Sequence, residues 1–329
     1  MWRVNDEEGA TAVMVALLLV PLIVAAAFVV DFGLIYWEVR QLQNGADAAA
    51  LAVAQDCAAG ELCTAAAAEP TAQRYADANS KDGASAILKV AIPGDDGPNC
   101  VTVTTGTRSA DGDPNLAHVL SRVIGIDSTT WERSATASWG SMGSGTTIPL
   151  TFSYCEWKVF TGLDFNATPE QITAALPTDV HVIYHHTSSA SDLNDCDGPA
   201  GQDTPGGFGW LDEEGPCSAF IENGEVEADT GASMSKACKE EFEKLVGKTV
   251  LMPIFVDVTG QGTKSVYEIG GFAGFEFHGY RFPGAASSPA PCGAPNTCVS
   301  GRFVQYYELG AEPADGDIDF GAYVVGLTG

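Results

Sequence analysis

The chain has 329 residues, of which 45% are hydrophobic and 18% are charged. This composition is too apolar for a disordered protein and too poor in charge for a coiled coil. Asp and Glu number 43 against 16 Lys and Arg, which gives a formal net charge of −27. That balance argues against nucleic-acid binding and against docking on anionic lipid, because both need clustered Lys and Arg.

An uncharged apolar segment extends from Ala10 to Val30. Its length matches the ~20 residues that a helix needs to cross the roughly 30 Å hydrocarbon core of a bilayer. A cleavable secretory signal is the competing interpretation, with Ala25–Ala27 as the cleavage site. However, acidic residues outnumber Arg3 before the segment, whereas a signal peptide begins with a basic region. The pattern favours a retained transmembrane anchor.

The orientation of this anchor does not follow from its basic residues, since Arg3 on one side is matched by Arg40 on the other. All the cysteines, nine in number, follow the apolar segment. Disulfides persist in oxidising compartments. We therefore expect a single-pass protein of the cell membrane, with residues 1–9 as a cytoplasmic stub and an extracytoplasmic C-terminal ectodomain.

The helical pattern continues beyond the apolar segment. Apolar residues recur there at every third or fourth position, as in an amphipathic helix: Ile35, Val39, Leu42, Ala46, Ala49 and Val53. The pattern predicts one continuous helix over residues 10–56. Its first half would lie in lipid and its second half on a globular head, which is a pilin-like architecture.

Four motifs in this helix carry a family resemblance: Glu8-Gly9-Ala10, Val30-Asp31-Phe32-Gly33, Gln41-Leu42-Gln43-Asn44 and the Ala-rich segment 46–52. With the apolar span between them, they resemble the N-terminal module of Tad (tight adherence) pilus-assembly proteins of the TadE/TadG-like type. The resemblance implies a membrane-anchored accessory protein of a Tad/Flp-type pilus system. Such a protein is a minor pilin-like subunit or an assembly factor, structural and adhesive, with pilin and pilus-assembly platform proteins as partners.

Two positions in this module are candidate functional residues. Gly9 and Ala10 form a candidate processing site, but Met14 stands where a processed pilin of this type carries Glu, so a retained anchor fits better. Asp31 lies at the expected membrane boundary. Its carboxylate is either solvated at the level of the headgroups or paired with the positive end of a partner chain.

The remaining sequence predicts a small α/β head, a linker and a β-rich ectodomain. In the head, residues 57–139, we expect a helix over 69–79, strands over 87–92, 100–105 and 128–139, and a helix that begins at Asp113-Pro114. Residues 140–147 are small and uncharged, which is typical of a linker. The whole chain is thus of the α+β class.

The ectodomain, residues 148–329, alternates strand-like segments with Gly, Pro and Asp turns, which suggests a sandwich-like fold. The expected strands are 148–157, 179–184, 249–258, 266–277, 302–308 and 321–328. Two short helices are expected, one from the capping box at Thr168 and one over 235–245.

An odd number of cysteines leaves at least one thiol free or paired between chains. Sequence proximity favours three pairs, with a fourth following from them: Cys57–Cys63, Cys292–Cys298 and Cys217–Cys238, then Cys155–Cys196. Cys100 would be left over. Spacing alone does not determine this connectivity.

The ectodomain carries no signature of an enzyme. Adjacent His185 and His186 point to opposite faces of a strand, so they do not easily share a metal ion, and HExxH and G-x-S-x-G motifs are absent from the sequence. We therefore expect no catalytic residue, no small-molecule substrate and no cofactor. Asp315, Asp317 and Asp319 alternate as in a partial calcium loop, so weak Ca²⁺ binding is an alternative to a solvated acidic surface. The alternative function is a membrane-anchored or secreted extracytoplasmic enzyme, or a calcium-binding ectodomain, behind a Tad-like leader.

Overall fold

The computed structural model describes residues 7–328, except 62, 98, 109–110, 113–115, 118–127, 186–195, 200, 203, 214, 222–223, 230–235, 261–264 and 311–317. The chain forms two compact units. Unit 1 comprises residues 1–53, 64–136 and 328–329, and unit 2 comprises residues 54–63 and 137–327. The long helix α1, Glu7–Ala58, supplies most of its length to unit 1 and its last turn to unit 2.

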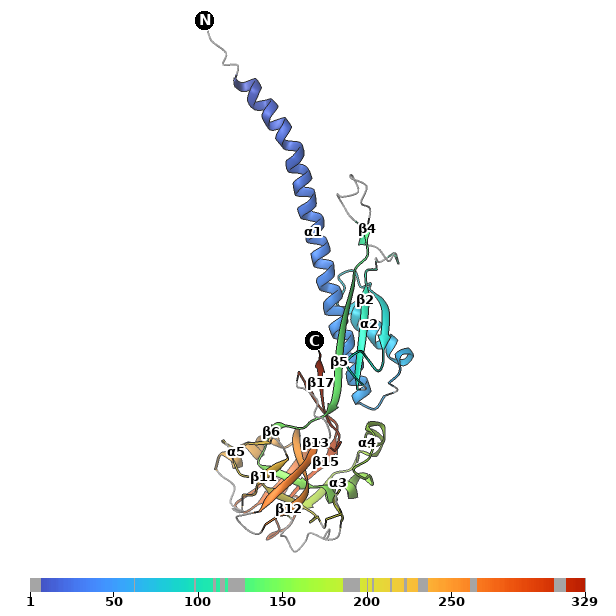
Figure 1. The fold of residues 1–329 in the computed structure, drawn as a ribbon. Helices are drawn as coiled ribbons and strands as arrows, with labels where there is room; N and C mark the ends of the chain where they lie inside the picture. The colour runs from blue at the N-terminus through green and yellow to red at the C-terminus, as the bar shows by residue number, and fades with distance from the viewer. Residues whose placement is uncertain are drawn as a thin grey trace. The chain divides into compact units, whose positions relative to one another are not determined.

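Unit 1 contains α1, one further helix and the first strands of the chain: α2 (Ala65–Ala78), β1 (Ala86–Ala91), β2 (Cys100–Gly106), β3 (Leu116–Ala117), β4 (Ser128–Thr129) and the first half of β5 (Glu132–Ser141). The sheet order is β1-β2-β5, and β1 and β2 are antiparallel. Figure 1 shows the C-terminal half of α1 beside this sheet and α2, whereas the N-terminal half extends away from them.

Small residues let α1 and α2 approach closely. The buried side chains of α2 are Ala68, Ala72 and Ala76. On α1, a Cβ atom added at Gly45 would lie 3.4 Å from the carbonyl oxygen of Ala76, which is contact distance. Glycine destabilises a helix by about 1 kcal/mol relative to alanine. At Gly45, the close packing of the two helix backbones offsets this cost.

Unit 2 consists of a large sheet, smaller strand pairs and three short helices. Its helices are α3 (Tyr154–Thr161), α4 (Pro169–Ala175) and α5 (Lys236–Leu245). Its strands are β6 (Gly145–Thr147), β7 (Leu150–Ser153), β8 (His181–Tyr184), β9 (Phe208–Trp210), β10 (Ala219–Ile221), β11 (Glu225–Glu227), β12 (Lys248–Thr259), β13 (Val266–Phe282), β14 (Ala285–Ala286), β15 (Cys298–Val304), β16 (Tyr306–Leu309) and β17 (Ala322–Leu327).

Eight of these strands form one mixed sheet with the order β8-β15-β13-β12-β7-β9, to which β11 and β14 add by pairing with β13. The β12–β7 pairing is parallel. Separately, β17 pairs antiparallel with the second half of β5 and parallel with β16.

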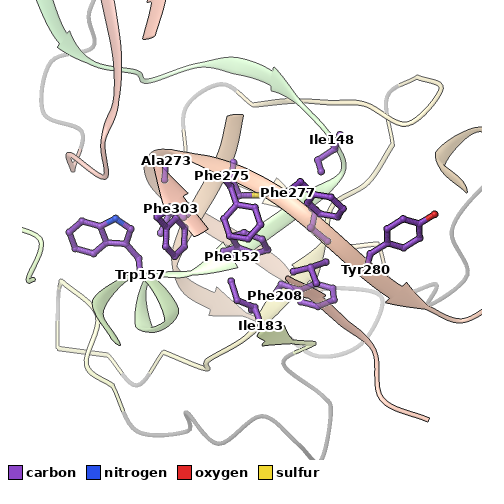
Figure 2. Packing of buried hydrophobic residues seen from close by; sticks show 14 of the residues in the cluster. Ile148, Phe152, Trp157, Ile183, Phe208, Ala273, Phe275, Phe277, Tyr280 and Phe303 are labelled. Carbon is purple, nitrogen blue, oxygen red and sulfur yellow. The ribbon is translucent and has the colours of Figure 1, made fainter. Parts of the chain in front are cut away.

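Phenylalanine rings fill the main core of unit 2 (Figure 2). Phe152 on β7 makes edge-to-face contacts with Phe275 on β13, at 4.7 Å between ring centroids, and with Phe303 on β15, at 6.0 Å. Gly301 makes room for this packing, since a Cβ atom there would lie 2.4 Å from the Phe275 ring. Edge-to-face pairs at these distances add stabilisation beyond that of the buried area alone.

The α+β class and most of the predicted elements are confirmed. Helix α4 begins with the expected capping box, in which Thr168 and Gln171 each accept a hydrogen bond from the other's backbone N–H. Most strands of unit 2 lie in one sheet, where two stacked sheets were expected.

Four local expectations differ from the structure. The single strand expected over 302–308 is divided between the end of β15 and most of β16, which lie in different sheets. The strand expected over 148–157 ends at Ser153, whose hydroxyl caps α3 by accepting from the Cys155 N–H. The linker expected over 140–147 contains the end of β5 and strand β6, which pairs with β10. Of the helix expected from Asp113, residues 116–117 form a strand that pairs with β4, and most of the rest lies outside the described residues.

Candidate membrane anchor

The N-terminal half of α1 exposes apolar side chains on every side. Exposed fractions are 60% for Val13, 70% for Leu17, 67% for Leu22 and 72% for Val29. Among the described residues, α1 is the one helix long and apolar enough to cross a membrane. Water is a poor solvent for such a surface, because each Å² of exposed apolar area costs about 25 cal/mol.

The C-terminal half of α1 is amphipathic and packed, as the sequence predicts. Leu42 is 3% exposed, and Ala46, Ala49 and Val53 are fully buried. Polar contacts accompany this packing: the Thr105 hydroxyl donates to the Leu42 carbonyl at 2.9 Å, and the backbone N–H of Lys81 donates to the Gln41 side chain at 2.5 Å. This half of α1 is part of the core of unit 1.

Asp31 lies between the two halves of α1. Its side chain is 2% exposed and is engaged within the chain, whereas its neighbours Val30 and Phe32 are 48% and 67% exposed. It therefore lies on the same side of the helix as Ile35 and Leu42. Its predicted role in binding a partner chain stays a prediction, as does processing between Gly9 and Ala10.

The structure contains four disulfides, the pairs that sequence proximity favours: Cys57–Cys63, Cys155–Cys196, Cys217–Cys238 and Cys292–Cys298. Cys100 is free and buried, and its thiol donates to the Gly97 carbonyl.

The first disulfide closes the loop that follows α1. This loop is held within unit 2, where the Ala59 carbonyl accepts from the Thr173 hydroxyl at 2.7 Å.

The described histidines of the ectodomain make aromatic or hydrogen-bonding contacts. His181 stacks on Phe160 at 4.4 Å, His185 meets Phe208 edge-on, and His278 pairs with Glu276. His186 lies outside the described residues. Within the part of the chain that is described, no three His, Cys, Asp or Glu side chains are grouped to hold a metal ion.

The calcium alternative rests largely on residues outside the described part of the chain, since Asp315 and Asp317 are among them. Asp319 is described, and its carboxylate accepts the Gly321 N–H at 2.9 Å. Burial raises the pKa of Asp319 to about 6. The Tyr323 hydroxyl lies near this carboxylate without meeting hydrogen-bond geometry. Calcium binding at these residues stays a prediction.

Glu156 is a buried carboxyl group that the sequence analysis missed. It lies in the first turn of α3, is 6% exposed and accepts the Gly207 N–H at 2.8 Å. Burial raises its pKa to about 7, although the Gly207 hydrogen bond acts in the opposite direction. A glutamate at a helix start is ordinary in sequence, so only the fold reveals that this one is buried.

One family model matches the N-terminal region of the chain. Residues 9–56 match the model of putative Flp pilus-assembly TadE/G-like proteins. This region is thus similar to TadE/G-like pilus-assembly proteins. The match begins at the predicted processing site and ends two residues before the end of α1, so it covers both halves of the helix and Asp31 between them.

The TadE/G-like module accounts for the anchor and not for the rest of the chain. No significant match was found among curated proteins or among solved structures. The β-rich unit 2 is therefore understood from its own geometry alone.

Proposed function

We propose that this protein is a single-pass, membrane-anchored accessory protein of a Tad/Flp-type pilus system. One observation carries the proposal: the TadE/G-like match covers a helix that is bare and apolar in its first half and forms protein core in its second. Such a helix is suited to hold a folded body at a membrane. The protein would act as a minor pilin-like subunit or as an assembly factor.

The orientation follows from the cysteines. Four disulfides, all after the apolar half of α1, require an oxidising compartment to form and persist. Unit 2 and the C-terminal part of unit 1 would then be extracytoplasmic, at the cell surface or in the pilus. The large acidic excess would keep such an ectodomain soluble and would repel anionic surfaces.

The proposed role is structural and adhesive. The TadE/G-like module contains no His, Cys, Ser or Lys, the side chains that most often act as nucleophile or base. Its partners would instead be the membrane, pilins and platform proteins, which α1 would contact through its apolar half or near Asp31.

The test is recovery of partners from cells. Detergent-solubilised full-length protein should co-purify with pilin and platform proteins, and the protein should be found in sheared pili or in the membrane fraction. Recovery of neither class of partner would contradict a pilus role.

The Asp31→Ala variant tests whether this residue binds a partner. Asp47→Ala is its matched control, because Asp47 is on the same helix and accepts a hydrogen bond from Gln43 one turn away at 2.8 Å. Loss of partners with Asp31→Ala alone would support a role in recruitment, whereas equal recovery from both variants would remove Asp31 from it.

A further inference from the structure

The segment of α1 just after the apolar span has an unusual exposed face. Phe32 is 67% exposed, and Tyr36 and Trp37 are each 59% exposed. At 100° per residue, these three side chains and exposed Arg40 share one side of the helix. Ile35 and Leu42, which are half-buried and buried, lie on the opposite side. We name Phe32, Tyr36, Trp37 and Arg40 the aromatic face.

From this face we propose that residues 32–40 of α1 lie in the headgroup layer of the membrane, so that the aromatic face sets the depth of the anchor. The inference rests on the proposed function, because it needs α1 to be a membrane anchor. The inference specifies where along α1 the protein emerges from the lipid and which surface of the helix contacts the headgroups.

The length of the helix supports contact between the aromatic face and the lipid headgroups. The stretch from Ala10 to Val30 is about 30 Å long at about 1.5 Å per residue, the thickness of the hydrocarbon core. Extending the stretch to Trp37 brings it to about 40 Å, which is the thickness of a bilayer with its polar layers. The aromatic face therefore begins where the hydrocarbon core ends.

The side chains of the aromatic face also favour contact with lipid headgroups. Trp and Tyr are enriched at membrane–water interfaces, where the ring lies among the acyl chains and its polar atom reaches water or headgroups. The guanidinium of Arg40 lies 4.9 Å from the centre of the Tyr36 ring and donates to its hydroxyl. A cation held there can bind a lipid phosphate. The face carries no acidic side chain, although the chain has 43 of them.

The inference also places unit 1. The side of α1 that bears Ile35 and Leu42 packs into unit 1 within about four turns of the span. If the opposite side lies among headgroups, unit 1 rests on the membrane surface and is not held away from it on a helical stalk. A second copy of α1 covering the aromatic face is the competing occupant, and it would hide Trp37 from lipid.

The test measures quenching of Trp37 by lipid. The full chain is reconstituted into phosphatidylcholine vesicles that carry bromine either near the headgroup end of the acyl chain or near its middle. Because Trp2 precedes the apolar span in the sequence, all variants carry Trp2→Phe. The emission lost on adding Trp37→Phe is the Trp37 signal. Trp139→Phe is the matched control, because Trp139 is a core residue at 8% exposure.

We expect the Trp37 signal to be quenched more by shallow bromine than by deep bromine. Trp139→Phe should leave the amount of emission lost to bromine unchanged. Flotation of the vesicles separates the two claims. Protein that floats with the vesicles while Trp37 is quenched by neither lipid would overturn the inference and leave the membrane anchor intact. Stronger quenching by deep bromine would also overturn it, because the face would then lie in the hydrocarbon core. Protein that does not float would overturn the anchor and the inference with it.

Discussion

Two long apolar runs in this chain find different environments. The run over Ala10–Val30 forms the exposed half of α1, and none of its most apolar window is buried. The run over Val250–Val256 forms the middle of β12, where the residues from Leu251 on are buried on both faces of the sheet. Met252, Ile254 and Val256 face the phenylalanine core, whereas Leu251 and Phe255 face a second cluster around Tyr267.

The comparison shows that an apolar segment indicates only that it must be shielded from water. It does not indicate whether protein or lipid shields it. The length of the segment separates the two cases. Neighbouring strands and helices can cover a short apolar strand, whereas an uncovered apolar helix as long as a bilayer is thick fits a lipid environment. Within α1 the environment of the apolar side chains changes along the helix. Before Asp31 the apolar side chains surround the helix, and from Leu42 they occupy one stripe that the protein itself buries.

The largest effect should come from charging the α1 run. Leu18→Arg with Leu19→Arg places two cations at the middle of the span, at about 2.5–3.5 kcal/mol each on insertion scales. We expect loss of membrane retention, measured by alkaline extraction of the membrane fraction. Leu309→Arg, at a site 61% exposed on unit 2, should leave retention unchanged. If the double variant stays in the membrane, lipid does not cover this run.

Truncation in the β12 run should cost less and affect folding instead. Phe255 is fully buried, with its ring 4.9 Å from that of Tyr267. Phe255→Ala should lower the free energy of unfolding by about 3–5 kcal/mol, because it leaves a cavity. Urea denaturation in detergent measures this, with Phe220→Ala at a 46% exposed site as the matched control. Equal costs for the two variants would mean that β12 is not a core strand.

Long patterns and local caps were predictable from the sequence. The period and length of α1, the capping box of α4 and the strands β12 and β13 each follow from neighbouring residues. The segment after Leu150 was not predictable in the same way. Its β-like residues continue into Trp157, but the Ser153 cap and the burial of Trp157, whose indole N–H donates to the Phe320 carbonyl, favour a helix.

The features of the candidate site also differ in how far the sequence predicts them. The membrane anchor is predictable because it is a local pattern of apolar residues. The burial of Glu156 depends on Gly207, which is distant in sequence, so no local signal reports it. The residues of the aromatic face can be read from the sequence over 32–40, but their exposure on one side of the helix is known only because unit 1 packs on the other side.

Glu156 should make the stability of unit 2 depend on pH. Its pKa is about 7 in the fold and near 4.5 in the unfolded chain, so the native state holds more protons between these values. Stability should therefore fall as pH rises from 5 to 8, by up to about 3 kcal/mol in total. Urea denaturation at several pH values measures this. Glu156→Gln should remove that part of the slope and be the more stable protein at pH 8. A slope unchanged by the substitution would mean that the carboxyl group is not buried.

The smallest effect separates two disulfides with the same sequence separation. Cys57–Cys63 and Cys292–Cys298 each span 6 residues, so loop entropy assigns each about 2 kcal/mol of the free energy of unfolding. Replacing either pair by serines should therefore cost a similar amount. Only the first pair adjoins α1, and its loop is held by Thr173 through the Ala59 carbonyl. Hydrogen exchange in detergent should show faster exchange over residues 54–58 in Cys57→Ser/Cys63→Ser than in Cys292→Ser/Cys298→Ser. Equal exchange there would mean that packing alone, without the disulfide, holds the end of the helix.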